Sequence, residues 1–169
     1  MSNGPSDRYA SSDQFLTTVG KLTQNAAITD IVLFCAFKVL AGCSHEVGQA
    51  IYYALESVPA KSRLVRRVAE VVGDAPEQAL VEEIIKAVEK AHAPRNELAH
   101  SLLTASDDGD PGKPWQRVSP KAMKQPTRPV TIAYLKSLMD PTSEAARTAH
   151  AVFGRLCQKR GIPAELKIS

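Results

Sequence analysis

Apolar side chains recur every three or four residues along most of this chain, and this spacing restricts the fold to packed helices. The clearest segment begins at Asp74 and Glu77, which are three residues apart, as in a capping box that starts a helix. The apolar residues that follow share one face of a helix that we expect to reach about His92: Leu80, Val81, Ile84, Ile85 and Val88. This segment therefore predicts an amphipathic helix that packs on a core.

The segments before it predict further helices by the same reasoning. We expect them over residues 13–24, 31–40, 45–56 and 57–73, with Asp13, Thr29 and Ser57 as starts and Gly42 and Gly73 as stops. Residues 31–40 are apolar nearly all round and should form the most buried helix. In the segment 45–56, Val47, Ile51 and Leu55 are four residues apart, so this stripe should face the core with Tyr52 beside it.

Prolines change the pattern after these helices. Pro94 cannot continue a helical hydrogen-bond ladder, so the chain should kink there or begin a new helix with Arg95 in its first turn. Prolines and glycines over residues 104–130 exclude a long helix and predict a loop or short hairpin, followed by helices over 132–139 and 141–161. The sequence thus predicts an all-α bundle of about five to seven helices, in one domain over residues 13–169 after a disordered N-terminus, residues 1–12.

The composition indicates an ordinary globular protein of the cytoplasm. The chain is 44% hydrophobic and 23% charged, which suffices for one core. Its three cysteines leave one unpaired under any pairing and form no CxxC motif, as expected in a reducing compartment. The longest apolar run stops at Lys38, so we expect neither a signal peptide nor a membrane span. The net charge of +3 is too small to predict a nucleic-acid partner by itself.

One short segment combines side chains suited to catalysis: Arg95, Asn96 and His100. Asn96 and His100 are four residues apart and share a helix face, and Arg95 on the adjacent strip is long enough to reach the same cleft. The enzyme signatures GxGxxG, GxxxxGKS, GxxxxGKT, HExxH and GxSxG are absent from the sequence. The alternative without catalysis is that Arg95 and Asn96 are surface residues and His100 is a hydrogen-bonded structural histidine.

The string Arg95-Asn96-Glu97-Leu98-Ala99-His100 resembles the R-polar-x-x-x-H motif of the HEPN superfamily, in the Arg-Asn-x-x-Ala-His form that bacterial members often carry. The resemblance is strict over the motif and loose over residues 13–103. It implies an all-helical fold and cleavage of RNA without a metal or other cofactor, through attack of the RNA's own 2′-hydroxyl on the adjacent phosphate. His100 would then exchange protons, Arg95 would stabilise the charge building on the phosphorane, and Asn96 would orient the imidazole or hold a phosphate oxygen. Backbone N–H groups of the expected first helical turn would add to the anion site.

The resemblance also implies partners. Family sites commonly form where two subunits meet, so we expect a homodimer, and an antitoxin or a nucleotidyltransferase is a further candidate partner. Ribonuclease members include toxins and phage-defence effectors, while other members are non-catalytic and bind RNA or nucleotides or act as dimeric partners. The occurrence of all three motif residues, Arg95, Asn96 and His100, favours the catalytic members of the superfamily. The non-catalytic alternative stays open.

A basic stretch after the motif is the expected RNA-binding region. Between Lys113 and Lys136 there are six basic residues and no acidic one. The predicted phosphate contacts are Lys113, Arg117, Lys121, Lys124 and Arg128. Trp115 in this stretch could stack on a base or pin the loop to the core, and the whole stretch could instead be a solvated loop.

Other conspicuous residues predict no separate site. Cys43, His45 and Glu46 are close in sequence, but no second pair of ligands accompanies them, so we expect no metal site. His92 and His150 fall near helix faces, and we expect both to be structural.

Overall fold

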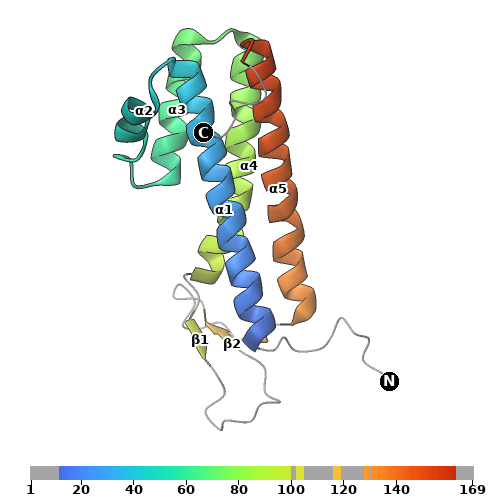
Figure 1. Cartoon of the computed structure of the whole chain (residues 1–169). Helices are drawn as coiled ribbons and strands as arrows, with labels where there is room; N and C mark the ends of the chain where they lie inside the picture. Colours follow the sequence, from blue (N-terminus) through green and yellow to red (C-terminus); the bar gives the residue numbers. More distant parts are fainter. Residues whose placement is uncertain (1–11, 100–101, 105–115, 119–127, 130, 163–169) are drawn as a thin grey trace.

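The computed structural model describes residues 12–99, 102–104, 116–118, 128–129 and 131–162, which form a helical bundle with one small sheet (Figure 1). The five helices of this described part are α1 (Ser12–Ala41), α2 (His45–Tyr52), α3 (Val58–Val72), α4 (Ala75–Ala99) and α5 (Ile132–Lys159). The long helices α1, α4 and α5 lie side by side, and α2 and α3 pack beside the C-terminal half of α1 (Figure 1). The predicted all-α bundle is therefore confirmed. Of the stretch 1–12, all but Ser12 lies outside the described residues.

Three short strands form an antiparallel sheet in the order β1 (Leu102–Thr104), β2 (Gln116–Val118) and β3 (Arg128–Pro129). The sheet lies at the end of the bundle where α4 ends and α5 begins (Figure 1). Most of the expected loop 104–130 lies outside the described residues. The strands that are described agree with the short hairpin expected there.

Two clusters of buried side chains hold the helices together. The larger joins the C-terminal half of α1 to α2, α3, α4 and α5, and includes Leu33, Phe37, Tyr52, Val65, Ile84, Val88 and Leu156. The smaller joins the first half of α1 to the last turn of α4 and the start of α5: Phe15, Leu22, Leu98, Leu135 and Leu138. The motif segment therefore reaches the core through Leu98.

The helix start expected at Asp74 is confirmed. The Asp74 backbone N–H donates to Oε2 of Glu77 at 3.0 Å, and the Glu77 N–H donates to Oδ1 of Asp74 at 2.9 Å. The same Glu77 carboxylate accepts two hydrogen bonds from Arg160, at 2.7 and 2.9 Å, and these hold the end of α5 against the start of α4. The pKa of Glu77 is lowered, chiefly because Arg160 stabilises its charged form.

Two predicted helix breaks are wrong, because α1 continues through Thr29 and α5 continues through Pro141. The buried Thr29 hydroxyl donates to the carbonyl of Ala26 at 2.8 Å, within the helix that it was expected to start. Nearby, Nδ2 of Asn25 donates to Oγ1 of Thr142 at 3.3 Å, which joins the two helices at the level where both breaks were expected. Packing on both sides of these positions outweighs the local stop signals.

The expected buried stripe of α2 is also wrong. Val47 and Ile51 are 51% and 46% exposed, whereas Gly48 and Tyr52 are buried, and the helix ends at Tyr52. A Cβ at Gly48 would lie 3.4 Å from the ring of Phe34 on α1. Gly48, and not the apolar residues Val47 and Ile51, therefore faces α1.

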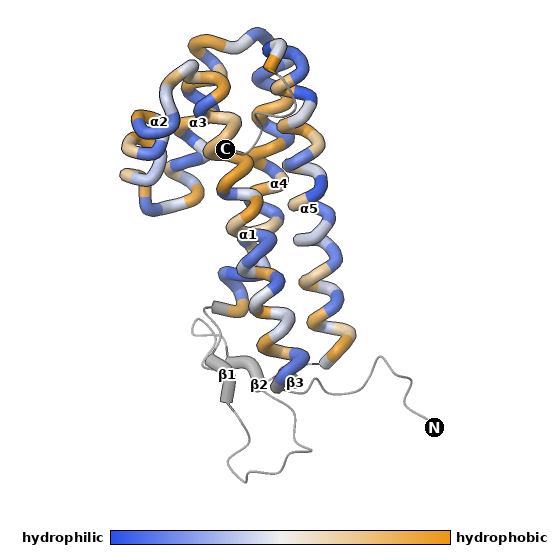
Figure 2. Tube along the Cα trace, in the orientation of Figure 1, coloured by the Kyte–Doolittle hydropathy of each residue, from blue (hydrophilic) through white to orange (hydrophobic). Residues whose placement is uncertain are grey.

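Hydrophobic residues are concentrated in the C-terminal half of α1 (Figure 2). Residues 32–37 are all buried there, as expected for the most apolar run. By length and composition alone, Asp13–Ala41 could cross a membrane, although half of its most apolar window is buried inside the bundle. Core helices of globular proteins meet the same criterion, so this feature is weak evidence for a membrane span.

We expect the Arg160→Ala variant to unfold more easily than the parent protein, by about 1.5 to 3 kcal/mol, because it leaves the buried Glu77 carboxylate without its charged donor. Urea denaturation followed by circular dichroism measures this free energy. Arg147→Ala is the matched control, since Arg147 is 71% exposed and pairs with Glu144 on the surface. Equal destabilisation by the two substitutions would contradict the role given to Arg160.

Candidate functional site

The described part of the motif, Arg95–Ala99, lies at the end of α4, so the expected helix start at Pro94 is wrong. The helix runs through Pro94 because Ala91 and Leu98, on either side of it, are both buried in the bundle. The last turn of a helix leaves carbonyl groups free, not N–H groups, and carries the negative end of the helix dipole. The backbone around Arg95 therefore supplies no anion site, and any anion would have to be bound by side chains.

Arg95 and Asn96 lie together on the exposed side of this turn. Nη1 of Arg95 donates to Oδ1 of Asn96 at 3.1 Å, and both residues are exposed. Within the described part of the chain, Arg95 forms no ion pair with a carboxylate, and the same is true of Arg63 on α3. The other described arginine side chains each pair with a glutamate: Arg66, Arg67, Arg147, Arg155 and Arg160. Arg95 thus keeps a guanidinium that an external anion can reach.

The remaining motif residue, His100, and the basic residues Lys113, Lys121 and Lys124 lie outside the described residues. Arg117 is placed on β2 and Arg128 on β3, and the strand register makes these two positions direct partners. Figure 1 shows that the strands lie at the same end of the bundle as the end of α4. The fold therefore brings the strands that carry Arg117 and Arg128 and the end of the motif helix to one end of the bundle.

Contacts with α1 and α5 hold the last turn of α4 in place. Leu98 is buried among side chains from α1 and α5, including Phe15 and Leu135. The Tyr134 hydroxyl of α5 donates to Oε1 of Glu97 at 3.3 Å. With its inner side anchored in this way, the turn presents Arg95 and Asn96 outward.

His92 lies one helical turn before Arg95 and Asn96. It lies next to a polar cluster that the sequence did not predict. Its Nε2 atom is buried and has no hydrogen-bond partner among the described residues. Burial lowers the pKa of His92, the nearby Asp30 and the Ala26 carbonyl oppose this, and Arg95 lowers it further. The available signal was the spacing of His92, Asn96 and His100, which are four residues apart in succession.

The cluster beside His92 is built on a buried ion pair between α1 and α3. Nζ of Lys61 lies 2.8 Å from Oδ2 of Asp30, and the Tyr52 hydroxyl donates to Oδ1 of Asp30 at 3.0 Å. Nζ of Lys61 also lies 4.8 Å from the centre of the Tyr52 ring and 5.0 Å from that of Tyr53. Burial and the Asp30 charge raise the pKa of Tyr52, so its hydroxyl stays protonated as a donor. The cluster ties α1, α2 and α3 together next to the motif helix.

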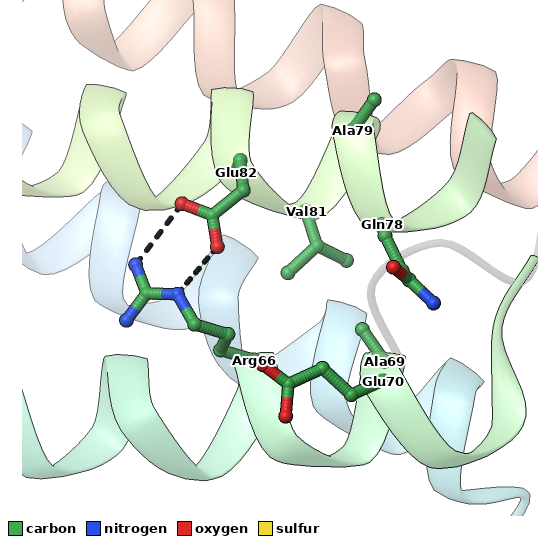
Figure 3. Close-up of a pocket in the computed structure, with 7 residues that line it drawn as sticks. All are labelled: Arg66, Ala69, Glu70, Gln78, Ala79, Val81 and Glu82. Atoms are coloured by element: carbon green, nitrogen blue, oxygen red, sulfur yellow. Dashed lines mark hydrogen bonds and ion pairs between the residues drawn. The ribbon is translucent and has the colours of Figure 1, made fainter. Parts of the chain in front are cut away.

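A surface pocket between α3 and α4 is a weaker candidate (Figure 3). The Arg66 guanidinium crosses it and binds both carboxylate oxygens of Glu82, while Glu70 lies beside it (Figure 3). The positive charge is thus compensated within the pocket, and the two glutamates disfavour a phosphate. This pocket does not support nucleotide binding.

The described residues contain no group of three His, Cys, Asp or Glu side chains placed to hold a metal ion. Cys43 and His45 lie at the start of α2, where the His45 ring packs edge-on against Phe34 with centroids 5.5 Å apart. His45 therefore has a packing role in the structure.

No family model matches this chain, and comparison with curated proteins and with solved structures likewise finds no match. The candidate site is therefore argued from its own residues.

We expect His92 to make the fold less stable as the pH falls from about 7.5 to about 5.5. Because the pKa of His92 is lower in the folded protein, the unfolded chain takes up the proton first, and stability present above the ordinary value of about 6.5 is lost on acidification. Urea midpoints at the two pH values measure the effect. His92→Gln should remove part of this pH dependence, and His150→Gln, at an exposed position on α5, should keep it. An unchanged pH dependence in His92→Gln would argue against the assignment.

Proposed function

We propose that this protein is a metal-independent endoribonuclease of HEPN type, with Arg95, Asn96 and His100 as its catalytic residues. The observation that carries the proposal is the exposed Arg95–Asn96 pair, whose guanidinium has no carboxylate partner among the described residues. His100 is four residues after Asn96 in the sequence. The end of α4 and the strands that carry Arg117 and Arg128 lie at one end of the bundle, which further supports RNA as the substrate (Figure 1).

The proposed reaction uses the 2′-hydroxyl of the RNA as the nucleophile. A base takes its proton as the oxygen attacks the adjacent phosphorus, the bond to the 5′-oxygen breaks, and an acid protonates that leaving oxygen. The products are a 2′,3′-cyclic phosphate and a 5′-hydroxyl end. His100 serves as one of these proton-transfer groups, and Arg95 stabilises the negative charge on the phosphorane through two parallel hydrogen bonds.

Because α4 ends at the motif, the anion site of this proposal consists of side chains and not of backbone N–H groups. Asn96 accepts a hydrogen bond from Arg95 and so orients the guanidinium. In this proposal, the Asn96 side chain also faces the substrate. A symmetric homodimer would supply a second Arg95 and a second His100, which gives the reaction both its acid and its base.

We expect His100→Ala and Arg95→Ala each to lower the rate of RNA cleavage by about 10² to 10⁴, because one removes proton transfer and the other removes charge stabilisation. Gel assays of structured RNA in EDTA measure the rate, and thermal melting checks the fold. Lys86→Ala, an exposed position on the same helix, is the control and should cleave normally. Cleavage that persists in both motif variants would show that the activity lies elsewhere. A parent protein that binds RNA in EDTA but never cleaves it would favour the non-catalytic alternative.

We expect the double variant Lys121→Glu/Lys124→Glu to bind RNA more weakly for every sequence and to lower the slope of log affinity against log salt by about 2, since two phosphate contacts are lost. Fluorescence anisotropy in a His100→Ala background measures binding without cleavage. The pair Lys86→Glu/Lys90→Glu makes the same charge change at exposed positions of α4 and should leave the slope nearly unchanged. Equal slopes for the two double variants would remove the basic stretch from the binding surface.

A further inference from the structure

The polar cluster around His92 connects the inside of the bundle to the proposed anion contact. His92 is three residues before Arg95 and four before Asn96, so the three side chains lie on neighbouring strips of α4. Its Nε2 is buried and unpartnered within the described part of the chain. A buried ring nitrogen without a partner is costly, and it leaves the protonation state of the ring to be decided by nearby charges.

Charged groups from three helices act on the pKa of this imidazole. Asp30 acts on it from α1, Lys61 from α3, and Arg95 from its own helix. The Asp30 carboxylate is already engaged by Nζ of Lys61 at 2.8 Å and by the hydroxyl of Tyr52 at 3.0 Å. Burial disfavours a charged ring, and a proton on His92 would also place a third cation near a single anion, so the pKa of His92 is lowered in the free protein.

We propose that His92 is a positioning residue that takes up a proton when a phosphodiester binds to Arg95. The bound anion compensates the charge of Arg95 and so removes one of the two cations that oppose a proton on the ring. The charged ring then attracts the anion in turn and holds Arg95 and the phosphate together at the end of α4. This inference rests on the proposed function only in taking Arg95 as the phosphate contact, and it does not require cleavage.

Thermodynamic linkage between proton binding and anion binding predicts the direction in which pH changes the affinity for the anion. If the anion favours the protonated ring, then protonation strengthens anion binding by the same factor. Affinity for a phosphodiester should therefore increase as the pH falls from about 8 to about 6, by roughly five- to tenfold for a coupling of ordinary size.

The test uses the full chain carrying His100→Gln, which removes the other titrating imidazole of the motif, and a 2′-O-methyl oligoribonucleotide, which cannot be cleaved. Nuclear magnetic resonance of labelled histidine follows the titration of His92 with and without the oligonucleotide. We expect His92 to titrate at higher pH in the complex, and Arg95→Gln to abolish the difference. In parallel, anisotropy at constant ionic strength should show tighter binding at low pH. This trend should vanish in His92→Gln and persist in His150→Gln.

Each outcome decides the proposal. An oligonucleotide that does not bind, or that binds while the titration of His92 stays unchanged, overturns it. A pH dependence of binding that survives in His92→Gln also overturns it. Because the resonance measurement needs no substitution at His92, a failure of that variant to fold does not affect the result. Failure of the proposed ribonuclease would appear separately, as absence of cleavage by the parent protein while the shift of His92 is still observed.

Discussion

Burial of α1 against the other helices is the constraint on which the rest of this structure depends. Leu33 and Phe37 are almost completely buried, and removing such a side chain from water contributes about 1.5 to 3 kcal/mol. Several such contributions on each side of a position exceed the roughly 3 kcal/mol that a proline costs inside a helix. For this reason α4 continues through Pro94 and α5 continues through Pro141.

The unbroken α4 sets the chemistry available at the motif. Had a helix begun at Arg95, its free N–H groups would have bound an anion together with the side chains. At the end of α4 the free backbone groups are carbonyls, which repel an anion, so the proposed function requires a side chain such as Arg95 to bind the phosphate. Its neighbour Asn96 and the anchored Glu97 and Leu98 limit how far this guanidinium can move.

Ion pairs between helices engage several cations of the bundle. Arg66, Arg155 and Arg160 each hold two helices together through a glutamate, and Lys61 pairs with the partly buried Asp30. These contacts stabilise the bundle. Arg95, like Arg63, forms no ion pair with a described carboxylate, and its guanidinium donates to the neutral amide of Asn96. In the proposed coupling, His92, one helical turn before Arg95, would link an anion bound at Arg95 to the charges of Asp30 and Lys61.

The sequence by itself determined the helical class, the capping box at Asp74 and the buried face that follows it, because these features depend on residues within one or two turns of each other. It also identified Arg95 and Asn96 as neighbours with reactive side chains. Only the tertiary structure decided that Thr29 lies inside a helix, that Gly48 and not Val47 faces the core, and that the charges of Asp30 and Lys61 act on His92. These outcomes depend on contacts between segments far apart in the chain, and a local pattern of spacing carries no information about them.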